Sequence, residues 1–398
     1  MKKLLLLVLA ASLLSPTANA APKAVAVKKL DIVASAVNAE GLVATGKTLV
    51  TYSNTGSTNS NILLTGLDVT GTQQWVRTID SGVDEIATVA TVDAAGAIWL
   101  AGSSAVATVA ESATAVIAAE NPDGVVAEEL PKVRADMNQI TIWKLSPLGE
   151  TLATYLSLQT SPALVSAISV NSSGVSLVGV MADRPFLVSA SPAGVFTKPL
   201  FIGTNKTALN AVVRSPDGSV NLFGESSETL GGKKLAGTRD GILVKVNKAG
   251  AVTNVVRSSA TKAQRSWLAA DSTLTLTGYV KSGKAIESAF TKFNSSFAPT
   301  WTTRIPSTGT STVLTAAGTT YGAFSSNSAI KGVTGWKPTT PTLLLATFTS
   351  KGVMTGAYAD SQLSAPISLV YTKELGLCGL ARGAAESISI FRLATRQS

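Results

Sequence analysis

The sequence predicts an all-β fold: a seven-bladed β-propeller of four-stranded antiparallel blades, with the ring closed by an N-terminal strand. Three observations predict it. Short turns of one type recur along the chain, β-forming segments flank each turn, and one strand of each repeat is rich in small residues. Periodic recurrence of one supersecondary unit indicates a solenoid, a propeller or another repeat array.

The recurrent turns begin with Asp, Asn, Ser or Thr and most of them close on glycine. One series is DVTG (68–71), SPLG (146–149), SPAG (191–194), NKAG (247–250) and TSKG (349–352), with NSSF (294–297) as a degenerate copy. A second series is DAAG (93–96), NSSG (171–174), SPDG (215–218) and AAG (316–318). Glycine supplies the positive φ that closes a tight turn. Each repeat is therefore interpreted as strand a, turn, strand b, loop, strand c, turn and strand d.

The flanking segments differ in the size of their side chains. Runs such as AIWLAG (97–102) and VNLFG (220–224) are apolar up to a glycine, as expected of sheets packed between neighbouring sheets. The predicted innermost strands are richer in small residues, because converging sheets leave least room near the axis: IATVAT (86–91), LVSAIS (164–169), ALNAVV (208–213) and STVLTAA (311–317). Trp75, Trp143 and Trp301 fall on predicted c or d strands. This taper favours a propeller over a linear solenoid.

The repeats predict seven blades. Their approximate limits are 31–80, 81–158, 159–203, 204–258, 259–306, 307–361 and 362–398. The last blade has only three strands, and we expect AVAVKKL (24–30) to supply the fourth. Pairing the two ends of the chain in this way would remove an exposed sheet edge, which otherwise invites aggregation.

Two segments resemble a known repeat. LDVTGTQQWVRTIDSGVDEIATVATVDAAGAIWLAGSS (67–104) and GTRDGILVKVNKAGAVTNVVRSSA (237–260) are similar to the β-propeller repeat of secreted bacterial proteins. The matching positions are Asp84, Ala87, Val92, Asp93, Gly96, Gly102, Asp240, Lys245 and Gly250. The resemblance implies a propeller and export. It implies no particular activity, because this family has no uniform one.

The N-terminus is typical of a secretory signal peptide. Lys2 and Lys3 precede an apolar stretch at 4–14, and Ala18-Asn19-Ala20 forms a small-x-small cleavage site. We expect residues 1–20 to be removed, and residues 21–398 to form a single propeller domain with a long insertion at about 103–138. No other segment is long and apolar enough to span a membrane. The expected location is secreted or on the exterior of the cell envelope.

Composition excludes several kinds of chemistry. The chain contains no histidine and one cysteine, Cys378, which excludes His-dependent triads, His-ligated zinc, thiolate metal clusters and intrachain disulfides. We expect Cys378 to be a buried, unreactive thiol. The Asp-Gly turns at 121–125 and 215–219 lack the closely spaced oxygen ligands of a calcium site. No cofactor and no metal are expected.

The charge of the chain favours weak attraction to an anionic polymer over binding to nucleic acid. The net charge is +9, and removal of Lys2 and Lys3 with the signal peptide would leave +7, but only 14% of residues are charged. Basic residues occur in isolated pairs and not in long blocks, so no nucleic-acid partner is expected. Attraction to an anionic or glycan polymer of the envelope fits this charge better.

Carboxylates are the remaining candidates for catalysis. Asp84 and Glu85 lie in a d–a connection, and Asp183 and Glu225 follow b strands. The d–a and b–c connections share one face of a propeller, so these acids would face one another if they clustered there, as in glycoside cleavage. The alternative is that Asp84 caps its turn and the acids are structural.

The b–c connections carry the clearest functional signal. They vary in length and include 103–138, 226–240, 280–285 and 325–341, and insertions on one face mark the binding face of a repeat protein. The segment 103–138 would form a protruding hairpin or helix or, alternatively, a poorly ordered excursion. The predicted partner-binding residues in the other loops are Lys233, Lys234, Arg239, Lys331, Trp336 and Lys337.

Trp336 has two interpretations. An exposed tryptophan beside Lys337 would stack on a carbohydrate or anchor a protein partner. Alternatively, Trp336 covers the adjacent blade.

Taken together, these features predict an exported, monomeric, non-catalytic binding or scaffold module. Its partner would be an unknown protein or an anionic or glycan envelope polymer. Two alternatives stay open: a His-free, carboxylate-dependent glycan-active enzyme, and a purely structural surface protein.

Overall fold

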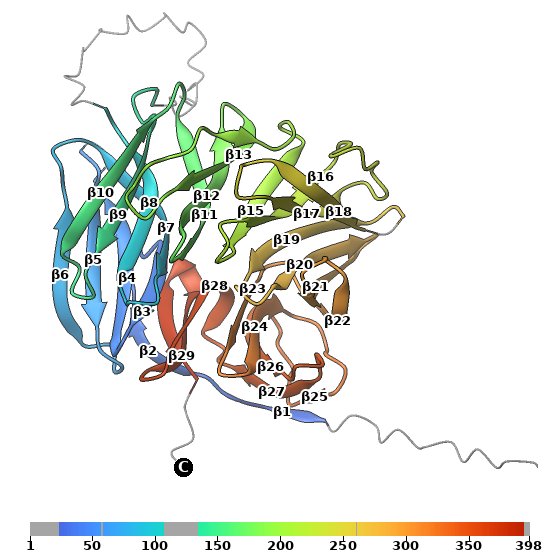
Figure 1. The fold of residues 1–398 in the computed structure, drawn as a ribbon. Coiled ribbons are helices and arrows are strands. Elements are labelled where there is room, and N and C mark those ends of the chain that lie inside the picture. Colours follow the sequence, from blue (N-terminus) through green and yellow to red (C-terminus); the bar gives the residue numbers. More distant parts are fainter. Residues whose placement is uncertain (1–23, 57–58, 107–133, 260, 394–398) are drawn as a thin grey trace, which may run out of the picture.

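The computed structural model describes residues 24–56, 59–106, 134–259 and 261–393. Its strands form seven sheets arranged around a central axis (Figure 1). Among these residues the single helical element is a short 3₁₀ helix, η1 (Ala384–Glu386), and no helix is long and apolar enough to cross a membrane. The predicted signal peptide and most of the insertion at 103–138 lie outside the described residues. The predicted all-β propeller fold is confirmed.

The sheets are numbered in chain order, and strands a to d run outward from the axis. Sheet 1 contains β3 (Gly41–Thr45), β4 (Thr48–Thr55), β5 (Asn61–Leu67) and β6 (Gln73–Ile79); sheet 2 contains β7 (Glu85–Val92), β8 (Ile98–Ser104), β9 (Gln139–Leu145) and β10 (Thr151–Leu158); sheet 3 contains β11 (Ala163–Asn171), β12 (Gly174–Met181), β13 (Arg184–Ala190) and β14 (Leu200–Phe201). Sheet 4 contains β15 (Thr207–Arg214), β16 (Val220–Ser226), β17 (Asp240–Val246) and β18 (Val252–Ser258); sheet 5 contains β19 (Gln264–Ala270), β20 (Thr275–Ser282), β21 (Ala285–Phe293) and β22 (Pro299–Pro306).

The last two sheets also use strands from the start of the chain. Sheet 6 contains β23 (Ser311–Ala316), β24 (Thr319–Ser326), β26 (Thr342–Phe348) and β27 (Met354–Ala359), extended by β1 (Val25–Lys29) and β25 (Val333–Thr334); sheet 7 contains β28 (Leu363–Thr372), β29 (Gly376–Gly383), β30 (Ile388–Arg392) and β2 (Asp31–Ser35). The prediction was seven four-stranded blades, and six of the observed sheets are plain four-stranded blades. The remaining sheet has six strands.

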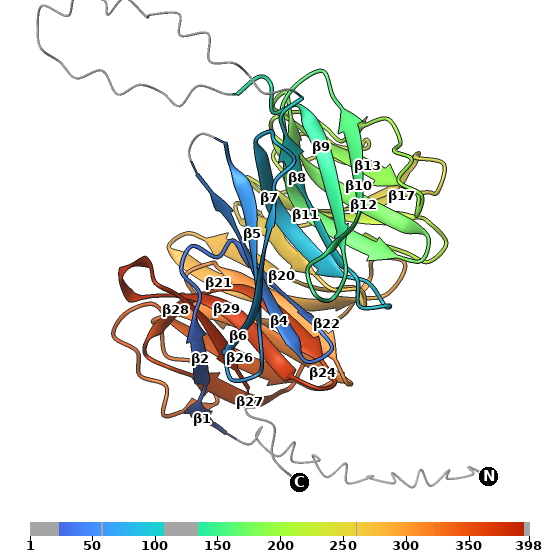
Figure 2. The ribbon, with the colours of Figure 1, turned by 90° about the vertical axis from the view of Figure 1, so that its left-hand side faces the viewer.

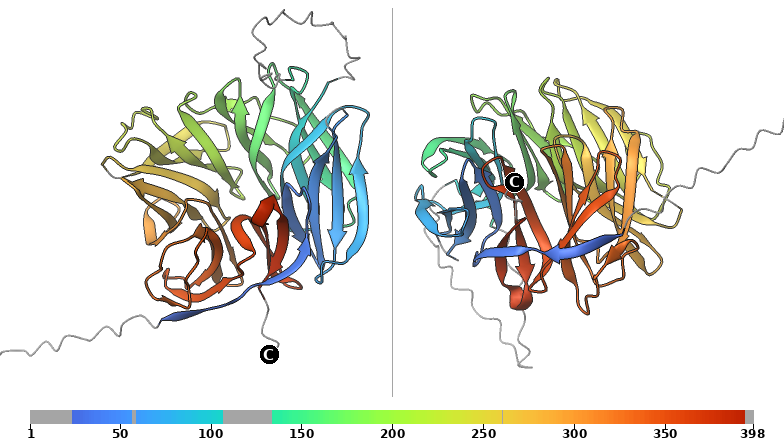
Figure 3. Two further views of the ribbon diagram at one scale, coloured as in Figure 1. Left: turned by 180° about the vertical axis from the view of Figure 1, so that it is seen from behind. Right: turned by 90° about the horizontal axis from the view of Figure 1, so that it is seen from below.

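The identity of the closing strand corrects the sequence prediction. The predicted segment 24–30 does not complete the last sheet, because β1 pairs in parallel with β27 and with β25 in sheet 6. The next five residues close the ring instead: β2 pairs with β30, with Ile32 opposite Phe391. Leu30, fully buried between the two strands, fixes the crossover from one sheet to the other. Figures 2 and 3 show this N-terminal segment passing along both sheets.

The seven a strands form the inner ring, as their small side chains predict. Each a strand contacts the a strand of the next sheet, and β28 contacts β3 to complete the circle. Each gap between neighbouring sheets contains its own cluster of buried apolar side chains. Cys378 is a free, fully buried thiol in the cluster between sheets 7 and 1, as predicted, and burial raises its pKa to about 11.

The glycine that ends several b strands has a structural cause. The a strand of each of sheets 2 to 5 carries a β-bulge at the same position of the repeat. The bulge brings the backbone of the residues just before it close to the facing b strand. A Cβ atom on Gly102 would lie 1.9 Å from the Ile86 carbonyl oxygen, and one on Gly224 would lie 1.9 Å from that of Ala208. Only glycine fits there, which explains why runs such as VNLFG end as they do.

Candidate functional site: the loop face and the central cavity

The ring has two unlike ends. We call the end with the b–c and d–a connections the loop face, and the end with the a–b and c–d turns the turn face. On the loop face, 12 residues or more separate β16 from β17 and β24 from β26, whereas two residues join β12 to β13 and β20 to β21. The connection at 280–285 is thus a tight hairpin, and 227–239 and 327–341 are the long described loops.

A buried ion pair anchors the long loop of sheet 4. Arg257 on β18 donates to the Asp240 carboxylate at 3.0 Å, and the two side chains are 8% and 0% exposed. The same guanidinium donates to the carbonyl oxygens of Glu228 and Lys233 within the loop. Burial alone would raise the pKa of Asp240, but hydrogen bonds from Ser259, two backbone N–H groups and Arg257 hold it below its usual value.

The remaining predicted residues of this loop divide into free and paired groups. Lys233 and Lys234 are exposed at its tip. Arg239 is paired with Glu225 at 2.7 Å, and the Tyr279 hydroxyl on sheet 5 lies 3.4 Å from the second Glu225 oxygen. Arg239 and Glu225 therefore join sheets 4 and 5, and their charges are largely compensated.

Trp336 lies inside the structure. It is 8% exposed, its Nε1–H donates to the Ser328 carbonyl oxygen at 2.9 Å, and it belongs to the apolar cluster between sheets 5 and 6. The expectation of an exposed tryptophan is wrong, and the alternative that it covers the adjacent blade is the one that fits. Lys331 and Lys337, on either side of it, are exposed.

The structure does not bring the four predicted acids together. Asp84 accepts the Ser60 backbone N–H and pairs with Arg134 at 2.7 Å, so it ties two loops of sheets 1 and 2. Asp183 is exposed in the two-residue turn between β12 and β13. Glu225 is held by Arg239 on sheet 4. These acids occupy three different sheets with separate partners, which does not support a facing catalytic pair.

Glu85 is the acid with the most unusual surroundings. It is 2% exposed at the start of β7, and its carboxylate accepts the Ser81 hydroxyl at 2.6 Å. Burial raises its pKa above the ordinary value, the nearby charge of Asp80 adds to this, and the hydrogen bonds from Ser81 oppose it. Its bonding pattern is that of a structural group in the d–a connection.

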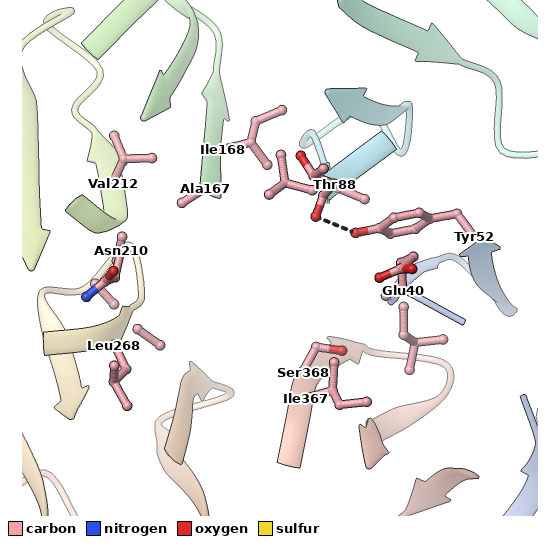
Figure 4. Close-up of a pocket in the computed structure, with 17 residues that line it drawn as sticks. Glu40, Tyr52, Thr88, Ala167, Ile168, Asn210, Val212, Leu268, Ile367 and Ser368 are labelled. Atoms are coloured by element: carbon pink, nitrogen blue, oxygen red, sulfur yellow. Dashed lines mark hydrogen bonds between the residues drawn. The ribbon is translucent and has the colours of Figure 1, made fainter. Parts of the chain in front are cut away.

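A cavity of about 330 Å³ lies at the centre of the ring (Figure 4). It is lined mainly by a strands, and Glu40 is the one charged residue in its lining within the described part of the chain. The Tyr52 hydroxyl donates to the Thr88 carbonyl oxygen at 3.1 Å, and burial, with the charge of Glu40, raises the pKa of Tyr52. Asn210 donates to the Trp267 carbonyl oxygen at 2.9 Å, so its side chain links two neighbouring a strands.

The bulged positions of the a strands explain this polar lining. Thr88 and Asn210 are the extra residues at two of the bulges, and the Thr88 hydroxyl also donates to the Val165 carbonyl oxygen of the next a strand, at 2.7 Å. Sequence reasoning missed these residues. The signal was present, because each is a polar residue within a strand of mainly small, apolar residues, IATVAT or ALNAVV.

No protein-family model and no curated protein matches the sequence. Solved structures are similar in fold. The chain resembles the β-propeller domain of Cps50 (Swd1) from Myceliophteria thermophila, with a TM-score of 0.50, 9% identity and coverage of 92% of this chain and 100% of that one. It also resembles the WD40 domain of Toxoplasma gondii coronin, with a TM-score of 0.51, 11% identity and coverage of 94% and 90%. At these identities the likeness concerns the fold alone.

Proposed function

We propose that the chain is an exported, non-catalytic binding module of the secreted bacterial propeller type that its repeats resemble. Its loop face would contact a protein or an anionic or glycan polymer of the envelope. The proposed address is the cell exterior, reached through cleavage of the signal peptide after Ala20. The cationic start, apolar stretch and small-x-small site at the N-terminus support that address.

The observation that carries this proposal is the arrangement of charge on the long loops. Glu225 and Asp240, the acids at the two ends of loop 227–239, are paired with Arg239 and Arg257, and the Glu228 carboxylate within the loop accepts hydrogen bonds from Thr204 and Thr207. Lys233 and Lys234 at the tip of the loop are exposed without an ion pair in the described structure. Lys331 and Lys337 present the same free charge on sheet 6. A loop anchored at its base loses little conformational entropy when its tip binds, and this favours a recognition role.

Capture of envelope material tests the proposal. Immobilised residues 21–398 are compared with a variant carrying Lys233→Gln, Lys234→Gln and Lys337→Gln, using the native envelope fraction at low and high salt. The matched control carries Lys47→Gln, Lys351→Gln and Lys373→Gln, which remove equal charge from exposed positions on the turn face. We expect one specific component to be captured by the wild type and the control and lost by the loop variant. Equal capture by all three proteins would contradict the role of the loop face.

A further inference from the structure

A second cavity, of about 470 Å³, opens on the turn face between sheets 3 and 4. It lies at the end of the ring opposite the loop face, because its walls are the a–b and c–d turns of both sheets and the strand ends beside them. Leu187, Val195 and Leu200 form its apolar side. Arg214, Lys198 and Lys248 form its polar side, together with serine and threonine hydroxyls. No carboxylate lines it within the described residues.

Arg214, the last residue of β15, is held in one orientation by neutral groups. Its Nε–H donates to the Ser173 hydroxyl at 2.9 Å, and Nη1 donates to Ser176 and Ser189 at 3.0 and 3.3 Å. Nη2 donates to the Ser173 carbonyl oxygen at 2.9 Å. A guanidinium has five N–H donors, so one N–H of Nη2 has no partner within the described residues.

Arg214 also forms no ion pair with a carboxylate within the described residues. Burial lowers its pKa, and the acid that acts on it, Asp217, is exposed in the adjacent turn and is itself hydrogen-bonded to Ser219. Four other arginines of the described structure show the contrast, because each contacts a carboxylate: Arg134, Arg239, Arg257 and Arg304. Burying part of a cation without a counter-ion costs free energy, and an anion that binds to the guanidinium would offset this cost.

A second basic residue, Lys248, borders the same part of the cavity. An ideal Cβ on Gly218 would lie 3.6 Å from Arg214 Nη2 and 3.7 Å from Lys248 Cβ, so the two basic side chains flank the same glycine. Lys198 lines the opposite wall of the cavity, in a bulge of the outer strand. Leu200 pairs with Leu187, and the Thr197 N–H donates to the Ser189 carbonyl oxygen. Lys198 and Pro199 therefore lie opposite one residue, Val188, and bulge out of the sheet.

The cavity exists because an aromatic side chain is missing. In sheets 2, 3 and 6 the glycine of the c–d turn packs on an aromatic from the preceding outer strand: Gly149 on Trp75, Gly194 on Tyr155 and Gly352 on Trp301. The equivalent Gly250 of sheet 4 has nothing within 4 Å of its ideal Cβ. Outer strand β14 is only two residues long, and its aromatic residue, Phe201, packs against the cluster between sheets 2 and 3 and not on Gly250.

We propose that this cavity is a binding site for a small organic oxyanion, a carboxylate or phosphate ester, whose apolar part lies against Leu187 and Leu200. Arg214 and Lys248 contact the anionic group. The serine hydroxyls that hold Arg214 fix the guanidinium in place before the ligand arrives, so that little ordering is needed on binding. This site is independent of the proposed function of the loop face.

Titration calorimetry of residues 21–398 tests the site with three probes: inorganic phosphate, phenyl phosphate and benzoate, at constant ionic strength. We expect saturable binding of phenyl phosphate or benzoate, whichever oxyanion fits, and weaker binding of inorganic phosphate, which lacks the apolar part. Arg214→Gln should weaken binding about tenfold or more, because a charge-assisted hydrogen bond is lost. Lys248→Gln should weaken it by a smaller factor, and Lys351→Gln, in the equivalent turn of sheet 6, should leave it unchanged.

A cavity-filling variant keeps the test valid if Arg214→Gln does not fold. Thr197 lies opposite Ser189, as Trp75 and Trp301 lie opposite the penultimate residues of their c strands, so Thr197→Trp places a ring where the other junctions have one. Loss of binding in folded Thr197→Trp supports the site. No saturable binding of any probe to the wild type, or binding that persists in both Thr197→Trp and Arg214→Gln, would overturn it.

Discussion

The junction between sheets 3 and 4 and the junction between sheets 5 and 6 are built from the same repeat but filled differently. At the second, Trp301 stacks on Phe348 with ring centroids 6.1 Å apart and covers Gly352. At the first, no ring covers Gly250, and the space is bordered by Arg214. At these two junctions the repeat therefore leaves one position that a single side chain either fills or leaves open.

The junction between sheets 4 and 5 shows a third solution. Outer strand β18 supplies no aromatic, and the turn that reads NSSF places Phe297 where the other turns have glycine. Phe297 adopts φ 63, is 3% exposed and packs edge-on against Phe223 at 6.1 Å. The degenerate turn is thus a compensation, since the backbone accepts an unfavourable φ so that the turn residue itself can fill the gap.

The largest expected effect separates the paired arginine from the unpaired one. Arg257→Gln leaves Asp240, 0% exposed, without its cation and should lower the free energy of unfolding by about 3–5 kcal/mol. Arg214→Gln removes no ion pair and should cost about 1 kcal/mol. Urea denaturation of both variants measures the difference, and equal losses would contradict the comparison.

The pH dependence of the same pair has a defined sign. The pKa of Asp240 is lower in the folded than in the unfolded state, so its stabilisation is present above the ordinary aspartate pKa and is lost as pH falls through the folded value. Wild type should therefore lose stability below about pH 4, and Asp240→Asn should show a smaller loss there. Melting temperatures between pH 7 and pH 3 test this, with a parallel decline in both proteins as the contrary result.

Emptying the filled junction should come next in size. Trp301→Ala removes a half-buried ring and should cost about 2–4 kcal/mol, because the contacts with Phe348 and Gly352 are lost and a cavity remains. Trp301→Phe, which keeps part of the ring, is the control and should lose less. A Trp301→Ala protein as stable as the wild type would mean that filling this position is unimportant.

Phe297→Gly tests the compensation between sheets 4 and 5. Loss of the buried ring costs about 3–5 kcal/mol, and relief of the left-handed backbone conformation returns about 1 kcal/mol, so a net loss of about 2–4 kcal/mol is expected. Chemical denaturation measures it. A stabilised Phe297→Gly variant would show that backbone strain outweighs packing at this turn.

The smallest expected effect is that of Thr197→Trp. The added ring fills the cavity between sheets 3 and 4 but removes the hydrogen bond from the Ser189 N–H to the Thr197 hydroxyl, so the net change in stability should lie within about 1 kcal/mol. Its melting temperature is the measurement. A loss as large as that of Trp301→Ala would show that the two junctions are not equivalent.

The repeating parts of the fold were predictable from the sequence because their causes are local. A glycine at the end of a turn indicates a position with positive φ, and a run of small residues indicates a crowded strand near the axis. Strands such as β7 and β15 were therefore placed correctly. The closing strand was not, because residues 24–35 form one β-prone run without a glycine or proline, and only the pairing with β27 and β30 divides it.

The site residues were less predictable because burial and pairing are long-range properties. The position of Trp336 in a loop gave no sign that its ring would enter the core between two sheets. Arg239 and Glu225 looked like separate surface charges and are partners. Arg214 was missed entirely, although Pro199, which follows the SPAG turn in the predicted blade 159–203, was a visible sign that the outer strand of sheet 3 would be incomplete.

The pairing of β2 with β30 sets an order of events in the life of the chain. Asp31 lies opposite Arg392, so during synthesis β2 waits for a strand that is made roughly 360 residues later. Until β30 has left the ribosome, β2 has no strand to pair with, sheet 7 is incomplete and the ring stays open. Such distant contacts make folding slow. The ring therefore closes only after β30 has been made, and loss of β30 would leave the facing edges of β2 and β29 without a partner.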